Sequence, residues 1–82
     1  MTPPVNKSQA FALVERLRTA SLSYHEHPDN RDLMAGMYDA RNAVVRAKNK
    51  LQDYYWSCAG SEADEISETL KQFEKALDTI IA

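Results

Sequence analysis

The stretch of sequence that decides the fold runs from residue 33 to residue 58 and reads LMAGMYDARNAVVRAKNKLQDYYWSC. One set of its residues recurs at alternating spacings of four and three, the heptad pattern of a helix that buries one seam against a neighbour. The set is Leu33, Met37, Ala40, Val44, Ala47, Leu51, Tyr54 and Cys58. Because Asp29 and Asn30 are both good N-caps, we predict a helix over about residues 30–58, roughly 43 Å long at about 1.5 Å per residue.

A second apolar seam follows Gly60. It comprises Ala63, Ile66, Leu70, Phe73, Leu77 and Ile80, at spacings of three and four that match those of the long helix. We expect Gly60 to end the long helix in the left-handed conformation and Ser61 to cap a helix over residues 61–81. Residues 60–82 carry six acids and two lysines, which complements the basic residues of the long helix. Together these features predict a long antiparallel, coiled-coil-like hairpin.

A further helix is predicted ahead of the hairpin, over about residues 7–25. Asn6 and Gln9 have the spacing of a capping box, and Pro28 disfavours helical geometry at the residue before it. The apolar residues again have helical spacing: Ala10, Leu13, Val14, Leu17, Ala20 and Tyr24. The sequence therefore predicts a single all-α domain over residues 1–82, in which the second and third of three helices form the hairpin.

The size and composition of the chain exclude several classes of protein. With 82 residues, 44% of them hydrophobic, the chain is too short for a two-domain enzyme and too apolar for a disordered segment. A formal net charge of −2 provides no global field for nucleic acid or an acidic membrane surface. Cys58 is the only cysteine, so no internal disulfide forms, and neither an apolar leader nor a membrane-length apolar run occurs. We therefore expect a cytoplasmic protein.

The residues that are able to carry catalysis or bind a metal form no recognisable motif. His25-Glu26-His27 is the most metal-like group, but residues two apart on a helix are rotated by about 200°, and too few further ligands exist to complete a tetrahedral site. Cys58 lacks the glycine-rich loop and orienting group that a nucleophilic cysteine needs. We expect no catalytic residue, no metal and no cofactor.

A mixed stripe of aromatic and basic residues lies beside the seam of the long helix. Tyr38, Arg41, Lys48 and Tyr55 follow one another at spacings of three, seven and seven. Aromatic faces together with cations suit a nucleotide base and a phosphate, so these four residues are candidates for ligand binding. In the alternative interpretation, the tyrosines cover a neighbouring helix while the cations extend into water.

The chain has more apolar surface than one hairpin is able to bury. Tyr54-Tyr55-Trp56 spans nearly all sides of a helix, so we predict that Tyr55 or Trp56 is exposed or in an interface. Ile80 and Ile81 are adjacent and cannot both point to one face of a hairpin. Trp56, Ile80 and Ile81 are therefore candidate interface residues, and homo-oligomerisation is the simplest way for so small a domain to cover them.

The layout of residues 24–82 resembles a known group of phage proteins. The resemblance is carried by Tyr24-His25, Pro28, a following helix, Cys58-Ala59-Gly60-Ser61 and Phe73-Glu74-Lys75-Ala76. These features are similar to those of phage-encoded anti-defence proteins of the sponge type, which sequester cyclic oligonucleotide signals. The resemblance implies a homo-oligomer in the host cytoplasm that binds a nucleotide at subunit junctions.

Two hypotheses of function follow from these features. The first is a small non-enzymatic helical protein that acts as a homo-oligomer through interaction with an unidentified protein, for example as an inhibitor of the phage anti-defence type. The alternative is a ligand-sequestering protein that binds a nucleotide or other small anion at a subunit junction. The second hypothesis requires the stripe of tyrosines and cations on the long helix to surround one concavity.

Overall fold

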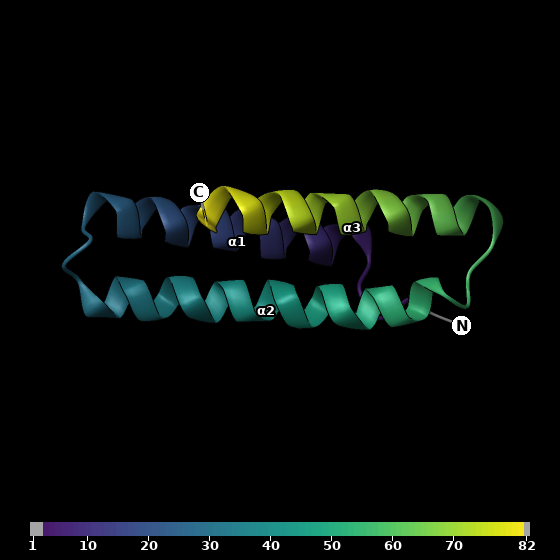
Figure 1. Cartoon of the computed structure of the whole chain (residues 1–82), viewed down its shortest axis with the longest axis horizontal. Coiled ribbons are helices and arrows are strands. Elements are labelled where there is room, and N and C mark those ends of the chain that lie inside the picture. The colour runs from purple at the N-terminus through teal and green to yellow at the C-terminus, as the bar shows by residue number, and fades with distance from the viewer. Residues whose placement is uncertain (1–2, 82) are drawn as a thin grey trace.

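The computed structural model describes the backbone of residues 3–81 and the side chains of residues 3–78, and every regular element in that part of the chain is an α-helix. The helices are α1 (Lys7–Glu26), α2 (Arg31–Tyr55) and α3 (Gly60–Ile81). They form an elongated bundle of 46 × 19 × 18 Å in which α2 runs antiparallel to both α1 and α3 (Figure 1). The all-α fold and the antiparallel α2–α3 hairpin are therefore confirmed.

The first two helices begin where the sequence predicts. The Asn6 side chain accepts a hydrogen bond from the Gln9 backbone N–H at 2.8 Å, and the Gln9 side chain accepts one from the Asn6 backbone N–H at 3.0 Å, which completes the capping box. The Asn30 side chain accepts hydrogen bonds from the backbone N–H groups of Asp32 and Leu33. Both caps satisfy donors that would otherwise lack a partner at a helix start.

The junction between α2 and α3 differs from the prediction. Helix α2 ends at Tyr55 rather than at Cys58, because the N–H groups of Ser57 and Cys58 bond to carbonyls three residues back, at 2.9 and 3.0 Å, and this tighter winding stops the α-helical ladder. Gly60 does adopt a positive φ of 66°, but as the first residue of α3 and not as the end of α2. The helix therefore begins before Ser61, and four residues separate α2 from α3.

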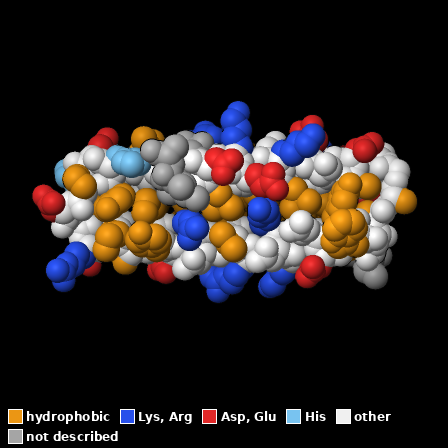
Figure 2. All heavy atoms as spheres, viewed as in Figure 1, with side chains coloured by type: hydrophobic (Ala, Val, Ile, Leu, Met, Phe, Trp, Pro, Cys, Tyr) orange, Lys and Arg blue, Asp and Glu red, His pale blue; other side chains and the backbone are white. Residues whose placement is uncertain are grey.

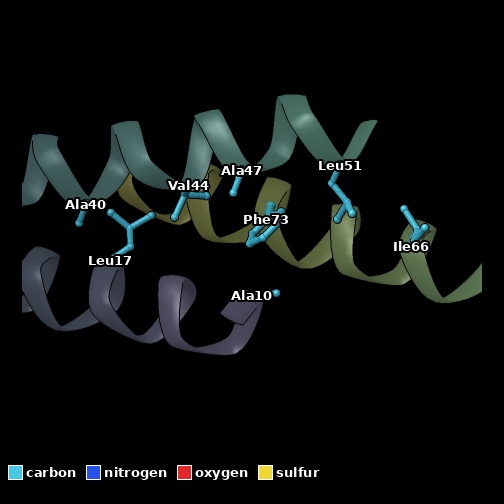
Figure 3. Packing of buried hydrophobic residues seen from close by; sticks show 8 residues of the cluster. All are labelled: Ala10, Leu17, Ala40, Val44, Ala47, Leu51, Ile66 and Phe73. Carbon is cyan, nitrogen blue, oxygen red and sulfur yellow. The ribbon is translucent and has the colours of Figure 1, made fainter. Parts of the chain in front are cut away.

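The core follows the predicted seams. Most of the predicted α2 seam is buried and its remaining members are half-buried, while Ile66 and Phe73 are the buried members of the α3 seam among the described side chains. In Figure 3, Leu51 points toward α3 at a level between Phe73 and Ile66, and Leu17 of α1 points toward Ala40. The buried cluster draws on all three helices and comprises Ala10, Leu17, Ala40, Val44, Ala47, Leu51, Ile66 and Phe73.

Helix α1 has a larger part in the core than the hairpin prediction implies. Figure 1 shows that α3 ends well short of the α1–α2 connection, so the core at that end of the bundle rests on α1 and α2 alone. Among the described side chains, two polar ones are also buried, Ser21 on α1 and Thr69 on α3. The Thr69 hydroxyl donates to the Glu65 carbonyl at 3.1 Å, which satisfies its hydrogen-bonding potential within its own helix.

Truncation of the hairpin seam provides a test of the core. Leu51 is almost completely buried, so Leu51→Ala should lower the free energy of unfolding by about 2–5 kcal/mol. Lys71 is exposed on α3, so Lys71→Ala should change it by no more than about 0.5 kcal/mol. Denaturant titrations of both variants measure the difference, and equal effects would show that the seam is misassigned.

The two glycines should respond in opposite directions to alanine. Gly36 is an exposed residue inside α2, and a Cβ there would have no atom within 4 Å, so Gly36→Ala should stabilise the protein by about 0.5–1 kcal/mol. Gly60→Ala should destabilise it by about 1–2 kcal/mol, because a side chain is strained at a φ of 66°. Chemical denaturation of the two variants measures both changes, and a shift of the same sign would contradict this account.

Candidate functional site

A groove runs along the surface between α1 and α3. It consists of two adjoining hollows, of about 480 and 700 Å³, and Phe11 and Gln72 line both of them, so the two hollows form one continuous groove. The first hollow is lined by Phe11, Val14, Glu15, Leu17, Arg18, Ser21, Leu22, His25, Gln72, Lys75 and Ala76. The second is lined by Lys7, Ser8, Ala10, Phe11, Asp64, Glu65, Glu68, Thr69 and Gln72. We call this feature the α1–α3 groove.

Two large apolar side chains of α1 are exposed on this groove. Phe11 is 65% exposed and Leu22 is 59% exposed. They are 11 residues apart, which is about three helical turns, so both project from one face of α1. Between them on the same face, Arg18 Nη1 lies 3.1 Å from Glu15 Oε1 in an exposed ion pair. The α1 side of the groove is therefore apolar at two points and charged between them.

Sequence reasoning missed Phe11 and Leu22 because neither belongs to the apolar seam of α1. A signal was nevertheless present: phenylalanine and leucine at positions off the seam, 11 residues apart, define a second apolar stripe on the helix. An amphipathic helix that carries a second stripe presents it either to another element of its own chain or to a partner. Among the described residues, α2 and α3 leave this stripe open.

The two hollows differ in charge. Three carboxylates and one lysine line the second hollow, and Lys7 Nζ lies 3.4 Å from Glu65 Oε1 in an exposed pair that joins α1 to α3. Two cations, one carboxylate and His25 line the first hollow. The groove is therefore net negative near the start of α3 and net positive toward the other end. Exposed pairs of this kind contribute only about 0–1 kcal/mol each, so they are free to exchange partners.

The four candidate ligand-binding residues are spread along α2. Tyr38 is 48% exposed, whereas Arg41, Lys48 and Tyr55 are half-buried. Tyr38 and Tyr55 are 17 residues apart, about 26 Å along a helix axis, and none of the four residues lines the α1–α3 groove. Lys48 Nζ lies 3.7 Å from Glu74 Oε1 of α3. The structure therefore does not bring these residues around the groove, and it gives one of the two cations a carboxylate neighbour.

The candidate interface residues are only partly described. Trp56 is 77% exposed in the connection after α2, with its ring edge-on to Tyr55 at a centroid distance of 5.9 Å, which confirms that the aromatic run leaves one ring in solvent. Helix α3 includes Ile80 and Ile81, but their side chains lie outside the described residues. The interface role of all three remains a prediction.

The described residues include no group of three or more His, Cys, Asp or Glu side chains that is placed to hold a metal ion. His25 and His27 are exposed at the end of α1, and the His25 ring lies tilted against Tyr24 at a centroid distance of 6.1 Å. In the same part of the chain, none of the helices has the length and hydropathy to cross a bilayer.

A polar contact joins the end of α2 to the start of α3. The Tyr54 hydroxyl donates a hydrogen bond of 2.6 Å to Glu62 Oε1, and this bond, together with desolvation and the charge of Glu62, raises the pKa of Tyr54 to about 12. The Cys58 thiol lies nearby, where its Sγ donates to the Tyr54 carbonyl at 3.4 Å. A phenol with so high a pKa keeps its proton at neutral pH. The hydrogen bond therefore suits the structural role of linking the end of α2 to the start of α3 better than it suits proton transfer.

Comparisons of the chain with protein-family models, with curated proteins and with solved structures found no match. The resemblance to phage sponge proteins therefore stays a prediction, and the function has to be argued from the groove itself.

The Tyr54–Glu62 contact predicts a pH dependence of stability. Because the pKa of Tyr54 is about 12 in the folded chain and 10.0 for a free tyrosine, the folded state holds the proton more tightly, and the stabilisation it provides is lost as pH rises from about 10 to 12. Tyr54→Phe should reduce stability at neutral pH and flatten this loss relative to the unmodified chain. Glu62→Gln should flatten it as well. Urea titrations across that pH range measure the effect, and a Tyr54→Phe curve parallel to that of the parent would refute it.

Proposed function

We propose that this protein acts by binding protein chains through the α1–α3 groove, and not by catalysis. The observation that carries the proposal is the exposure of Phe11 and Leu22, 65% and 59%, at points about three turns apart on the groove face of α1. Large apolar side chains that remain exposed on a small helical protein are typical anchors of protein–protein contacts, because they lose unfavourable hydration when a partner covers them.

The shape of the groove suits a helix or an extended peptide. The two hollows follow α1 from Lys7 to His25, and Val14 and Ala76 contribute apolar surface to the lining. Polar and charged side chains, such as Glu15, Arg18 and Gln72, surround the apolar points. An apolar centre within a polar rim is the ordinary arrangement of a protein interface.

The mixed charge of the groove also favours a protein over a small anion as the bound species. Carboxylates and cations both line it, whereas a phosphate site needs converging cations or N–H donors without competing carboxylates. On α2 the candidate cations are spread along the helix, and Lys48 lies beside Glu74. For these reasons we prefer protein binding to ligand sequestration. An inhibitor that covers the surface of a larger protein would use the same groove.

Photo-crosslinking from the groove tests this proposal. Benzoylphenylalanine replaces Phe11 with a reactive aromatic of related shape, and the variant chain is produced in the source cell and irradiated. We expect protein adducts from this position, with a second copy of the chain counted among the possible partners. Leu22→Ser in the same chain should reduce their yield at least about threefold, because it removes the other apolar anchor.

The matched control places the same photoreactive residue at Asn49, an exposed polar position on α2. We expect few adducts there. Equal yields from Asn49 and Phe11, or none from Phe11, would overturn the proposal that the α1–α3 groove is the binding surface.

A further inference from the structure

The charges on α1 are arranged in opposite signs about Phe11. Lys7 precedes Phe11 by four residues and Glu15 follows it by four, so both lie about one turn from it on the same side of the helix. Lys7 and Phe11 line one hollow of the groove, and Phe11 and Glu15 line the other. Along the groove, the side chains of α1 are therefore, in order, positive at Lys7, aromatic at Phe11 and negative at Glu15.

Helix α3 shows the same arrangement with the signs reversed. Glu68 precedes Gln72 by four residues and Lys75 follows it by three. Gln72, like Phe11, lines both hollows and so marks the centre of the groove on its own helix. Along the groove, the side chains of α3 are therefore, in order, negative at Glu68, polar at Gln72 and positive at Lys75. Both helices carry opposite charges at nearly equal distances on either side of one central residue.

A charge pattern that changes sign about its centre is complementary to its own copy turned end for end. In a two-fold symmetric dimer whose axis lies in the interface and crosses the helices, each helix faces its own counterpart running in the opposite direction. A residue one turn before the centre then meets the residue one turn after it. Lys7 would face Glu15 of the second copy, and Glu68 would face Lys75 of the second copy.

We propose that the α1–α3 groove is the dimerisation surface of this protein, with a second copy packed antiparallel across it and the two-fold axis near Phe11 and Gln72. The inference rests on the proposed function, and it names the partner as the chain itself. Phe11 lies at the centre, where it packs against Phe11 of the second copy. The dimer thereby buries a side chain that is 65% exposed in the single chain. Each of the two charge pairs occurs twice by symmetry.

The parallel alternative is disfavoured by the position of Phe11. In a dimer whose axis runs along the helices, α1 of each copy would face α3 of the other at the same level, so Phe11 would meet the polar Gln72. The antiparallel arrangement instead places the two Phe11 side chains together, and it brings the acidic end of the groove, with Asp64, Glu65 and Glu68, to the end that contains Arg18 and Lys75. The contacts of Lys7 with Glu65 and of Arg18 with Glu15 within one chain are exposed, and they exchange for contacts across the interface at little cost.

Charge reversal provides a test that few other interfaces would pass. In Lys7→Glu, the new carboxylate faces Glu15 of an identical copy, and in Glu15→Lys the new ammonium faces Lys7. Each single variant alone should therefore have a dimer dissociation constant at least about tenfold higher than the parent chain at low salt, because two like-charge contacts replace two pairs. An equimolar mixture of the two variants should dimerise as the parent does, since every contact in the heterodimer again joins opposite charges.

The measurements are sedimentation equilibrium of the parent, the two variants and their mixture from micromolar to millimolar concentration, with circular dichroism as a check on folding. Phe11→Ser should abolish the dimer, and Trp56→Ser, at the exposed aromatic outside the groove, should leave it unchanged. Dimerisation that responds to Trp56→Ser and not to Phe11→Ser, or single variants that associate as well as their mixture, would overturn the proposal.

This result is separable from the result for the proposed function. A chain that stays monomeric while its Phe11 position crosslinks to other proteins overturns the dimer and leaves protein binding through the groove intact. A monomeric chain without adducts from Phe11 overturns both. Adducts of twice the chain mass, together with rescue by the mixed charge variants, support both.

Discussion

The structure depends on one constraint, which is that the apolar seam of α2 has to be buried by two helices that are each shorter than α2 itself. Leu51 points toward α3, and Ala40 lies opposite Leu17 of α1. Different parts of the α2 seam are therefore covered by different helices. The neighbours are staggered along α2, as Figure 1 shows. This stagger produces a bundle 46 Å long and only 19 Å wide.

The same constraint accounts for the open surface. Helices α1 and α3 are held by α2 and meet each other along only part of their length, with the buried side chains Ala10 and Thr69 facing the channel between them. Phe11 follows Ala10 directly and is therefore turned away from the core, toward the groove. The face formed by α2 and α3 is similar, because in Figure 2, which looks onto these two helices, apolar side chains gather at several places with charged side chains between them. A bundle that is so narrow has to leave apolar side chains on its surface, because three helices enclose few positions completely.

Much of the fold could be predicted from the sequence, because the information is local or periodic. The caps at Asn6 and Asn30 depend on residues two or three positions away, and the α2 seam depends on a repeat that runs through the whole helix. The sequence predicts the end of α2 at Cys58, three residues too late, because Cys58 continues the heptad. The backbone N–H groups of Ser57 and Cys58 already bond to carbonyls three residues back, which ends the α-helix at Tyr55. The Tyr54–Glu62 bond was missed for a related reason: it joins two helices across a connection whose geometry no periodicity encodes. For the candidate site, the pattern identified charged and aromatic stripes on α2, but the groove belongs to α1 and α3, whose relative placement only packing decides.

The parallel course of α1 and α3 has an electrostatic consequence. Each α-helix carries a macrodipole, with about half a positive charge at its N-terminus and half a negative charge at its C-terminus. In an even bundle of alternating helices these dipoles cancel in pairs, but here α1 and α3 point the same way and α2 opposes only one of them. The chain is left with the dipole of one unopposed helix, directed along its long axis, and the carboxylates at the start of α3 lie at its positive end. The electrostatic energy of so elongated a dipolar molecule falls when a second copy lies beside it in the reverse direction.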